Sequence, residues 1–273
     1  MTYLETLFGV SGKTALVTGG ATGIGRMMAT ALVQGGARVL IASRKGEACE
    51  AVAADLNALD ASGSAEGFAG DVGSEDAINA LSAEVLNRTG RLDILINNAG
   101  VTWGQPYAEF SHAAWQKVFN INVAGLFTLT RNLTPLLATS ASDADPARII
   151  NIGSVMGTVP LAEGAYSYSA SKAAVHHLTR ILAAELAGKR ITVNAFAPGP
   201  FPSKMTAFAI GNEEGQEKVG ANVPLGRVGT PEDIAGATLF LCGRGGAYTT
   251  GCILPLDGGM SVEGPANLFA NAL

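Results

Sequence analysis

The stretch KTALVTGGATGIG, residues 13–25, decides the expected fold of this chain. Residues 13–18 form a largely apolar, β-branched run that predicts a strand, and this run ends at a pair of glycines. Helical spacing of apolar residues follows over residues 24–34. A strand, a glycine-rich turn and a helix in this order are typical of the first unit of a doubly wound α/β fold.

Strands and helices alternate along the rest of the chain. Further strands are expected at residues 38–43, 66–71, 92–97, 148–153, 191–197 and 252–256. Helices are expected at residues 49–59, 74–88, 112–137, 168–186 and 231–241, with Ser74 and Thr230 as caps. Most of these strands are nearly continuous in apolar residues, which indicates burial on both faces and therefore a parallel sheet. The sequence predicts a Rossmann-type α/β fold, a doubly wound parallel sheet of about seven strands with helices on both faces.

One domain is expected over residues 1–273, because no linker rich in proline, serine or glycine divides the chain. The main interruption is residues 199–223, which are Pro-rich at first and then polar. Doubly wound sheets bind ligands at the carboxyl ends of their strands, so this insertion is expected to be a lid. The C-terminal tail, residues 261–273, is expected to reach a neighbouring subunit or to cover a pocket.

Composition and charge exclude several classes of function. Hydrophobic residues make up 48% of the 273 residues and charged residues only 15%, which is typical of a chain with a large buried core. The net charge of −5 gives no electrostatic basis for a nucleic-acid or anionic-membrane partner. No apolar stretch approaches the ~20 residues of a membrane span, and no basic region of a signal peptide begins the chain. We therefore expect a cytoplasmic protein.

The cysteines and histidines show no metal-binding pattern. The three cysteines are unevenly spaced and are interpreted as ordinary core thiols of a reducing compartment. The histidines, His112, His176 and His177, have no ligand spacing with carboxylates or cysteines. We interpret all three as helix-surface or interface residues and expect no metal.

The glycine-rich turn predicts a phosphate-binding cradle. Its glycines at 19, 23 and 25 follow G-x-x-x-G-x-G, and Thr22 lies between the first two. A side chain at Gly19 or Gly23 would block the approach of a diphosphate, and the helix that opens near Ile24 directs backbone N–H groups at an anion. A glycine-rich turn without a ligand is the alternative. The position between a strand and a helix favours a dinucleotide.

The end of the second strand indicates which dinucleotide is bound. NAD sites usually place a carboxylate there for the ribose hydroxyls, whereas this chain has Ser43, Arg44 and Lys45. Arg44 can bind a 2′-phosphate through two hydrogen bonds, and Lys45 adds positive charge. Two solvated basic residues are the alternative, but the pattern favours NADP(H). Asp71 and Val72, at the end of the third strand, are expected near the adenine.

A tyrosine and a lysine are the expected chemical centre. Tyr168 and Lys172 are four residues apart on a predicted helix and therefore share one face. A nearby ammonium and the positive charge of an oxidised nicotinamide both favour the phenolate, so we expect the pKa of Tyr168 to be lowered below its ordinary value of about 10. Tyr166 is the competing phenol, but Lys172 lies about 600° further around the helix from it and so on another face. A Tyr/Lys pair on an exposed helix face is the alternative.

Two further polar residues, from other parts of the sequence, are expected to act together with Tyr168 and Lys172. Ser154 lies just past the end of the strand at residues 148–153, beside the expected crevice, where its hydroxyl could stabilise a substrate oxygen. Asn122 interrupts an otherwise apolar helix, where an amide needs a partner. One interpretation is that Asn122 kinks the helix and holds a water that links Lys172 to solvent. The alternative interpretations are a small turn serine and simple structural hydrogen bonding.

Together these motifs resemble those of single-domain short-chain dehydrogenases/reductases over nearly the whole chain. In order they are TGGATGIG at 18–25, NNAG at 97–100, Asn122, Ser154, YSASK at 168–172 and Pro198-Gly199. The resemblance implies that Ser154, Tyr168 and Lys172 are catalytic and that Asn122 completes a tetrad. It also implies that Lys172 holds the nicotinamide ribose. The family commonly has threonine where this chain has Ser203, which keeps the hydroxyl.

The same resemblance implies further contacts and a reaction. The remaining implied cofactor contacts are Asn98, Ala99, Gly100, Pro198, Gly199, Phe201 and Ser203. The reaction is pro-S hydride transfer between NADP(H) and a carbonyl/secondary alcohol, with Tyr168 as the proton donor. The family usually forms homo-oligomers, dimers or tetramers, through the helices around residues 112–137 and 168–186 and through the last strand.

The substrate is expected to be small and apolar. Aromatic and aliphatic residues follow the fourth strand and populate the insertion; they are Trp103, Tyr107, Phe201, Met205, Phe208 and Ile210. The stretches NNAGVTWG, NIGSVMG, APGPFPSKMT and GAYTTG resemble the β-ketoacyl reductases associated with bacterial rhamnolipid synthesis. A 3-oxoacyl thioester or related β-keto compound is therefore the expected substrate. The alternatives are a steroid, aromatic or general secondary-alcohol dehydrogenase, and a dinucleotide-sensing or scaffold protein without catalysis.

Overall fold

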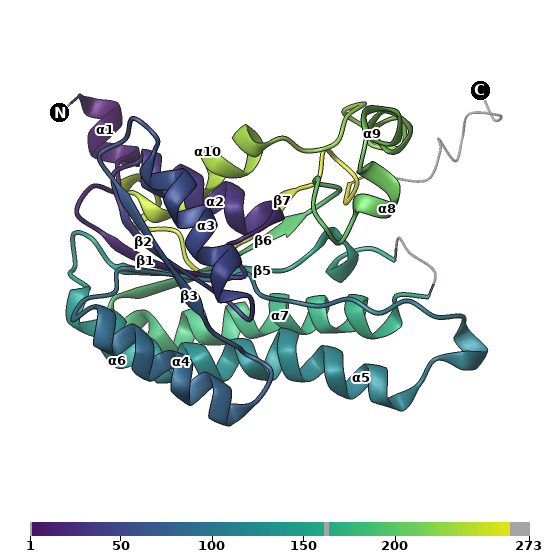
Figure 1. The fold of residues 1–273 in the computed structure, drawn as a ribbon, viewed down its shortest axis with the longest axis horizontal. Helices are drawn as coiled ribbons and strands as arrows, with labels where there is room; N and C mark the ends of the chain where they lie inside the picture. The colour runs from purple at the N-terminus through teal and green to yellow at the C-terminus, as the bar shows by residue number, and fades with distance from the viewer. Residues whose placement is uncertain (1, 161–163, 263–273) are drawn as a thin grey trace, which may run out of the picture.

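Seven parallel strands form one sheet in the order β3-β2-β1-β4-β5-β6-β7, so the chain starts in the middle and winds outward twice. The computed structural model describes residues 2–160 and 164–262 (Figure 1). The strands are β1 Thr14–Thr18, β2 Arg38–Ser43, β3 Ser64–Ala69, β4 Ile94–Asn97, β5 Ala147–Ile152, β6 Ile191–Pro198 and β7 Ile253–Leu256. This topology confirms the predicted Rossmann-type sheet, and every predicted strand is present to within two residues at each end.

Helices cover both faces of the sheet. The α-helices are α1 Tyr3–Phe8, α2 Gly23–Gln34, α3 Gly46–Asn57, α4 Glu75–Arg88, α5 His112–Phe119, α6 Leu126–Ser140, α7 Tyr166–Leu186, α8 Ala207–Ile210, α9 Glu213–Gly220 and α10 Pro231–Cys242. The shorter helical segments are η1 Tyr107–Glu109, η2 Asn120–Gly125, η3 Val155–Gly157, η4 Ala187–Lys189 and η5 Arg244–Gly246. In Figure 1, α2, α3 and α10 lie above the sheet, and α4, α6 and α7 lie below it.

Successive residues of the buried strands supply two hydrophobic cores. Val17 and Ile96 face the α2 side, where they join the cluster that contains Met28. Leu16 and Leu95 face the α6 side and belong to the cluster that contains Leu133 and Leu182. Because neighbouring side chains of a strand point to opposite faces, a strand with helices on both sides is apolar throughout. The continuous apolar runs in the sequence have this cause.

Three features depart from the predicted elements. The helix expected at residues 112–137 is α5 and α6 joined by the π-helical segment η2. The insertion at residues 199–223 contains the short helices α8 and α9. Helix α1 was not predicted, because it has only 6 residues, none of them buried, and therefore shows no apolar periodicity. Its cap is Thr2, whose Oγ1 accepts a hydrogen bond from the Glu5 N–H at 3.3 Å.

The C-terminal tail and the three cysteines are the remaining features predicted from the sequence. Residues 263–273 of the predicted C-terminal tail lie outside the described residues. Cys49 and Cys242 are buried free thiols, and burial raises the pKa of Cys242 to about 12. Cys252 is free and half-buried. No helix within the described residues is long and apolar enough to cross a membrane.

Candidate active site

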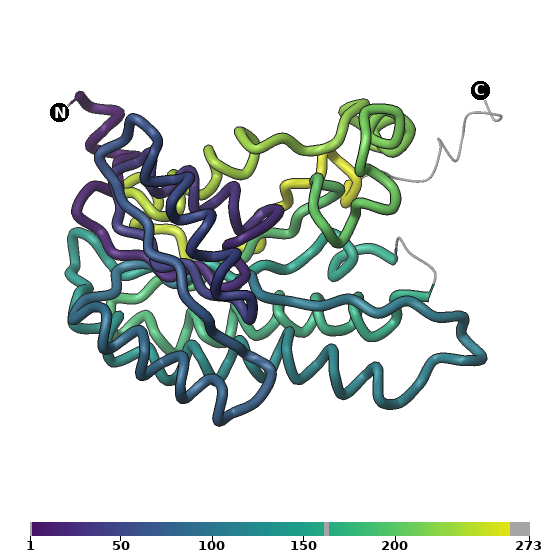
Figure 2. Tube along the Cα trace, viewed as in Figure 1, coloured from purple at the N-terminus to yellow at the C-terminus, as the bar shows by residue number. Residues whose placement is uncertain are grey.

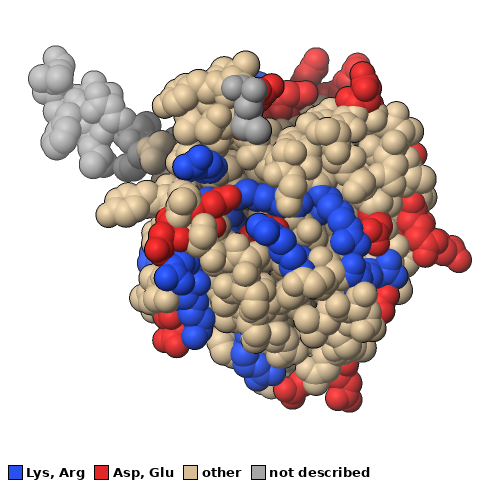
Figure 3. Space-filling model, turned by 90° about the vertical axis from the view of Figure 1, so that its left-hand side faces the viewer, with Lys and Arg blue, Asp and Glu red and all other residues tan. Residues whose placement is uncertain are grey.

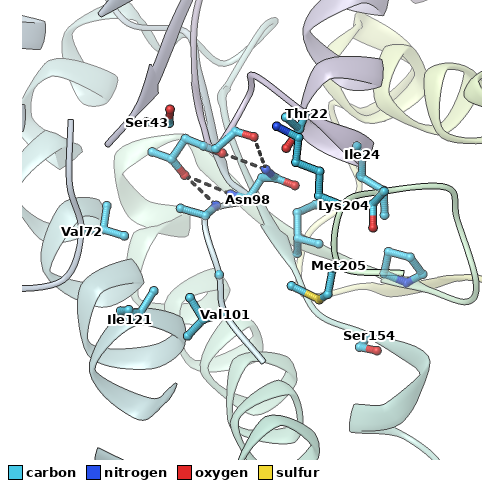
Figure 4. Close-up of a pocket in the computed structure, with 18 of the residues that line it drawn as sticks. Thr22, Ile24, Ser43, Val72, Asn98, Val101, Ile121, Ser154, Lys204 and Met205 are labelled. Atoms are coloured by element: carbon cyan, nitrogen blue, oxygen red, sulfur yellow. Dashed lines mark hydrogen bonds between the residues drawn. The ribbon is translucent and has the colours of Figure 1, made fainter. Parts of the chain in front are cut away.

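A cleft of about 380 Å³ opens at the carboxyl ends of the strands, between the start of α2, the turn after β5, helix α7 and the insertion (Figure 4). Nearly every predicted site residue lines this cleft. The predicted residues that line it are Gly19, Thr22, Gly23, Ile24, Ser43, Arg44, Asp71, Val72, Asn98, Ala99, Gly100, Ser154, Tyr168, Lys172, Pro198, Gly199, Phe201 and Ser203. Lys45 and Asn122 are not among the residues that line it.

The glycine-rich turn has the geometry of a ligand cradle. Gly19 and Gly23 have φ values of +66° and +54°, a backbone region that side chains disfavour. A Cβ on Gly19 would lie 2.9 Å from Asn98 Nδ2, and one on Gly23 would lie 2.8 Å from the Cβ of Ser203. Thr22 is the N-cap residue of α2 but makes no side-chain capping bond, and the first turn carries no acidic residue. The N-terminus of α2 therefore keeps its positive end for an anion.

Asn98 ties the end of β4 to this cradle. Its Nδ2 donates to the backbone carbonyls of Thr18 at 2.9 Å and Gly19 at 3.1 Å, and its N–H donates to Thr18 Oγ1 at 3.1 Å (Figure 4). The side-chain NH₂ group is therefore committed to the backbone of the glycine turn. Asn98 shapes the cleft wall by holding the turn in place.

The adenosine end of the cleft contains one unpaired cation. Arg44 lines the cleft, is exposed, and makes no ion pair or hydrogen bond with any residue that the structure describes. Lys45 is exposed at the N-cap of α3 and does not line the cleft. On the opposite wall, Asp71 accepts a hydrogen bond from the Gly73 N–H at 3.0 Å and lies beside Val72. Arg44 is therefore a cationic side chain of the cleft lining that has no partner among the described residues.

The reactive end of the cleft joins Tyr168, Lys172 and Ser154. The hydroxyl of Ser154 lies close enough to the phenol of Tyr168 to favour its ionised form, which partly offsets the effect of burial on the pKa of Tyr168. Lys172 Nζ lies 5.5 Å from the centre of the Tyr168 ring and donates to the Ile152 carbonyl at 2.7 Å. Ser154 and Lys172 are 7% and 5% exposed, so these two polar groups are largely shielded from water, whereas Tyr168 is half-buried. The predicted i, i+4 alignment on α7 is present.

Lys172 alone does not produce the predicted lowering of the Tyr168 pKa. Burial raises the pKa of Tyr168, and the nearby Ser154 hydroxyl only partly opposes that effect. Lys172 lies over the face of the ring and donates to a backbone carbonyl, so it does not hydrogen-bond the phenol oxygen. Burial also lowers the pKa of Lys172 to about 8. Both groups are therefore held with their protons on at neutral pH.

Asn122 lies next to this group, in the π-helical segment η2. Its Oδ1 accepts from the Val101 N–H at 2.9 Å, and its Nδ2 donates to the Val101 carbonyl at 2.9 Å and to Ser171 Oγ at 3.0 Å. A Cβ on Gly100 would lie 3.2 Å from Asn122 Oδ1 and 3.6 Å from Lys172 Nζ. The expected irregularity of the helix is present, and the amide serves as a structural link between η2, the loop after β4 and α7.

His176 corrects one interpretation and adds a residue that the sequence analysis missed. It is 5% exposed, not a surface residue, and its Nε2 accepts from the Ser154 N–H at 3.4 Å. Burial and the nearby Lys172 and Arg180 charges lower the pKa of His176 to about 4. Its spacing of i+4 from Lys172 placed it on the same helix face and could have revealed it. His112 and His177 are exposed, as predicted.

The apolar residues of the predicted substrate pocket are divided among four environments. Phe201 and Met205 line the cleft. Tyr107 and Phe208 are 83% and 92% exposed, and Ile210 is buried in the insertion. Trp103 is half-buried, with its Nε1 donating to Gln105 at 2.8 Å. Tyr166 packs edge-to-face against the rings of Tyr107 and Phe110, away from Lys172 as predicted.

Comparison with known proteins agrees with this geometry. A protein-family profile described as enoyl-(acyl carrier protein) reductase matches residues 19–261. The chain belongs to the short-chain dehydrogenase/reductase family. It is 44% identical to the rhamnolipids biosynthesis 3-oxoacyl-[acyl-carrier-protein] reductase of Pseudomonas aeruginosa, over 94% of this chain and 99% of that protein. The predicted resemblance to this short-chain dehydrogenase/reductase group is confirmed.

Two further relatives show how widely such chains vary in substrate. The solved RhlG/NADP active-site complex of Pseudomonas aeruginosa superposes with a TM-score of 0.89 at 44% identity, covering 94% of this chain and 99% of that chain. A galactitol 2-dehydrogenase (L-tagatose-forming) of Cereibacter sphaeroides is 37% identical, over 94% of this chain and 98% of that protein. Similar chains therefore include proteins named as a 3-oxoacyl-[acyl-carrier-protein] reductase and as a galactitol 2-dehydrogenase.

Proposed function

We propose that this short-chain dehydrogenase/reductase uses NADP(H) to reduce the keto group of a 3-oxoacyl thioester or a related β-keto compound. The observation that carries the proposal is that Ser154, Tyr168 and Lys172 line one cleft together with Arg44, with Lys172 Nζ 5.5 Å from the centre of the Tyr168 ring. The relatives include 3-oxoacyl-[acyl-carrier-protein] reductases, at up to 44% identity.

The residues of the cleft fit NADP(H). The uncapped N-terminus of α2 and the close approach allowed by Gly19 and Gly23 suit a diphosphate. The unpaired guanidinium of Arg44 suits a 2′-phosphate. Lys172 is positioned to hold a ribose hydroxyl at the buried end. When bound there, NADPH supplies the hydride.

The protein's own residues then supply the proton. Tyr168 donates its phenolic proton to the carbonyl oxygen as negative charge develops there, and the Ser154 hydroxyl donates a hydrogen bond to the same oxygen. The Lys172 ammonium stabilises the phenolate that remains. Ser154 also accepts from the Met156 N–H at 3.2 Å, which fixes the direction of its hydroxyl.

The protonation state of Tyr168 suits a proton donor at neutral pH. Burial of Tyr168 raises its pKa and so keeps the phenolic proton in place.

The decisive experiment is the Tyr168→Phe variant, assayed with 3-oxoacyl thioesters and NADPH. Removing the proton donor is expected to lower kcat at least about a thousandfold, while NADPH affinity changes by less than about threefold. Binding of NADPH is measured separately by fluorescence. Activity within tenfold of the wild type would contradict the assignment of Tyr168. Turnover of polyols but no β-keto compound would favour the alternative, a general secondary-alcohol dehydrogenase like the galactitol relative.

We also propose a cytoplasmic homo-oligomer, most simply a homotetramer. The helices that the sequence analysis named as interfaces expose apolar side chains, and these are Trp115, Phe127, Tyr166 and Ile181. Free cysteines suit a reducing compartment. Light scattering coupled to size-exclusion chromatography tests the oligomer, and a monomer at micromolar concentration would contradict it.

A further inference from the structure

Lys204 is a cleft residue that the sequence analysis did not single out. It belongs to the segment that follows β6 and lines the cleft together with Thr22, Gly23 and Ile24. In Figure 4 its side chain extends along the cleft toward Thr22, at the start of α2. Lys204 therefore adds a positive charge to the cleft that the glycine turn also lines.

The backbone of this segment is fixed against the cradle. Ser203 packs on Gly23 so closely that a Cβ on the glycine would lie 2.8 Å from the Cβ of Ser203. The Ser203 N–H donates to Thr206 Oγ1 at 3.0 Å, and Thr206 Oγ1 donates to the Phe201 carbonyl at 2.8 Å. These bonds close a turn with Lys204 at its tip. The position of Lys204 follows from this packing.

Lys204 has no protein partner that would explain it. It is exposed and makes no ion pair or hydrogen bond with any described residue. The other lysine of the insertion, Lys218, pairs with Glu214 at 2.6 Å. Asp71 is the carboxylate among the residues that line the cleft, and it lies on the wall near Val72. Lys204 is therefore a positive charge without a counter-ion at an anion-binding helix terminus.

We propose that Lys204 binds the diphosphate bridge of the dinucleotide. The inference rests on the proposed use of NADP(H). A diphosphate at the N-terminus of α2 lies between backbone N–H groups on one side and the Lys204 ammonium on the other. Lysine suits this role because it acts as a compact charge that needs no fixed hydrogen-bond direction.

Two cations then divide the two anionic groups of NADPH between them. Ser43, which precedes Arg44, and Lys204 lie on opposite sides of Asn98 in Figure 4. Arg44 serves the 2′-phosphate, which NADH lacks. Lys204 serves the diphosphate, which NADPH and NADH share. The two residues therefore have different signatures in binding measurements.

The test measures dissociation constants of Lys204→Gln, Lys218→Gln and Arg44→Gln by isothermal titration calorimetry. The ligands are NADPH, NADH and 2′-AMP, the last of which carries the 2′-phosphate but no diphosphate. Lys204→Gln is expected to weaken NADPH and NADH equally, by about tenfold, and to leave 2′-AMP unchanged within about twofold. Lys204→Arg keeps the charge and is expected to stay within about threefold of the wild type.

Lys218→Gln is the matched control, because it removes the same charge from the same insertion outside the cleft. Four results would overturn the proposal: an effect of Lys204→Gln below about twofold, a loss confined to NADPH, a loss for 2′-AMP, or an equal loss in Lys218→Gln. None of these results bears on the role of Tyr168. A wild-type protein that binds neither dinucleotide would instead refute the proposed function itself.

Discussion

Basic residues gather at both ends of the sheet, but they are used differently at each. At the amino ends of the strands, arginines and lysines lie next to acidic side chains (Figure 3, which views the left-hand end of Figure 1). Lys13 and Arg148 both contact Asp145, at 2.7 Å and 3.0 Å. Arg91 pairs with Asp93 at 2.7 Å. At the carboxyl ends, Arg44 and Lys204 have no partner among the described residues.

The paired end also stabilises a helix terminus. Arg148, 1% exposed, donates to the carbonyls of Leu241 and Gly243 at 2.9 Å each, and Lys13 donates to the carbonyl of Cys242 at 3.2 Å. These three carbonyls lie at the C-terminus of α10, where backbone acceptors have no intrahelical partner. Figure 2 shows the N-terminal segment and the end of α10 close together at this edge.

The contrast suggests a rule for interpreting charges in this protein. A cation that has a carboxylate and backbone carbonyls around it stabilises the fold, whereas a cation that lines a cleft without either is available to a ligand. The rule predicts the effects of substitutions at the amino ends and at the carboxyl ends of the strands.

Removing the buried arginine should cause the largest loss of stability. Arg148→Met removes the guanidinium donor from the Leu241 and Gly243 carbonyls and leaves Asp145 with one cation fewer, so the free energy of unfolding should fall by about 3 kcal/mol. Urea denaturation measures the change. The exposed pair Arg26–Asp55 gives the control, because Arg26→Met should cost less than about 0.5 kcal/mol. A loss below about 1 kcal/mol in Arg148→Met would show that the paired end is not structural.

The free energy of unfolding should depend on pH through His176, which lies near the carboxyl ends of the strands. Its pKa is lowered from 6.5 to about 4, so between these values the unfolded chain binds a proton that the folded protein does not. Stability should therefore be complete above pH 6.5 and fall as pH decreases toward 4. Between pH 7 and pH 4.5 the His176 contribution should cost about 2 kcal/mol.

The non-titrating variant His176→Gln isolates this effect. Its glutamine can still accept a hydrogen bond from the Ser154 N–H, but it cannot take up a proton. The difference in unfolding free energy between the wild type and His176→Gln should shrink toward low pH. His177→Gln, on the exposed neighbouring residue, should show no such trend. If the difference in unfolding free energy between the wild type and His176→Gln stayed constant as the pH falls, the lowered pKa of His176 would be refuted.

The sequence predicts features that depend on local burial and spacing, but it does not predict interactions between segments that are far apart in the chain. Strands and helices were predictable because burial on two faces produces apolar runs, and the cleft was predictable because Gly19, Gly23, Tyr168 and Lys172 must have those identities at those spacings. Interaction partners that lie far apart in the sequence were not predictable. Nothing in the local sequence distinguishes Lys204, which is unpaired, from Lys13, whose carboxylate lies far along the chain. The raised pKa of Tyr168 likewise depends on burial by distant elements.

Arg44 should control the choice between dinucleotides. Arg44→Gln removes the unpaired guanidinium and should weaken NADPH by about tenfold while leaving NADH within about twofold, because only NADPH carries the 2′-phosphate. Stability should not change, since the guanidinium contacts no described residue. Equal loss of both cofactors would assign Arg44 to a group that they share and would remove the basis of the predicted NADP(H) preference.

Lys45→Gln is expected to have the smallest effect on NADPH binding. It tests most directly whether a cation must both lack a protein partner and line the cleft to bind a ligand. Like Arg44 it is exposed and has no side-chain hydrogen bond or ion pair among the described residues, but it lies outside the cleft lining. If both the absence of a partner and a position in the cleft are required, Lys45→Gln should weaken NADPH by less than about threefold, since the charge then acts only through screened long-range attraction. Titrations at low and high salt separate the two cases, because a long-range effect disappears in high salt. If Lys45→Gln instead matched Arg44→Gln at both salt concentrations, the 2′-phosphate would be held by both residues, as the sequence alone predicted.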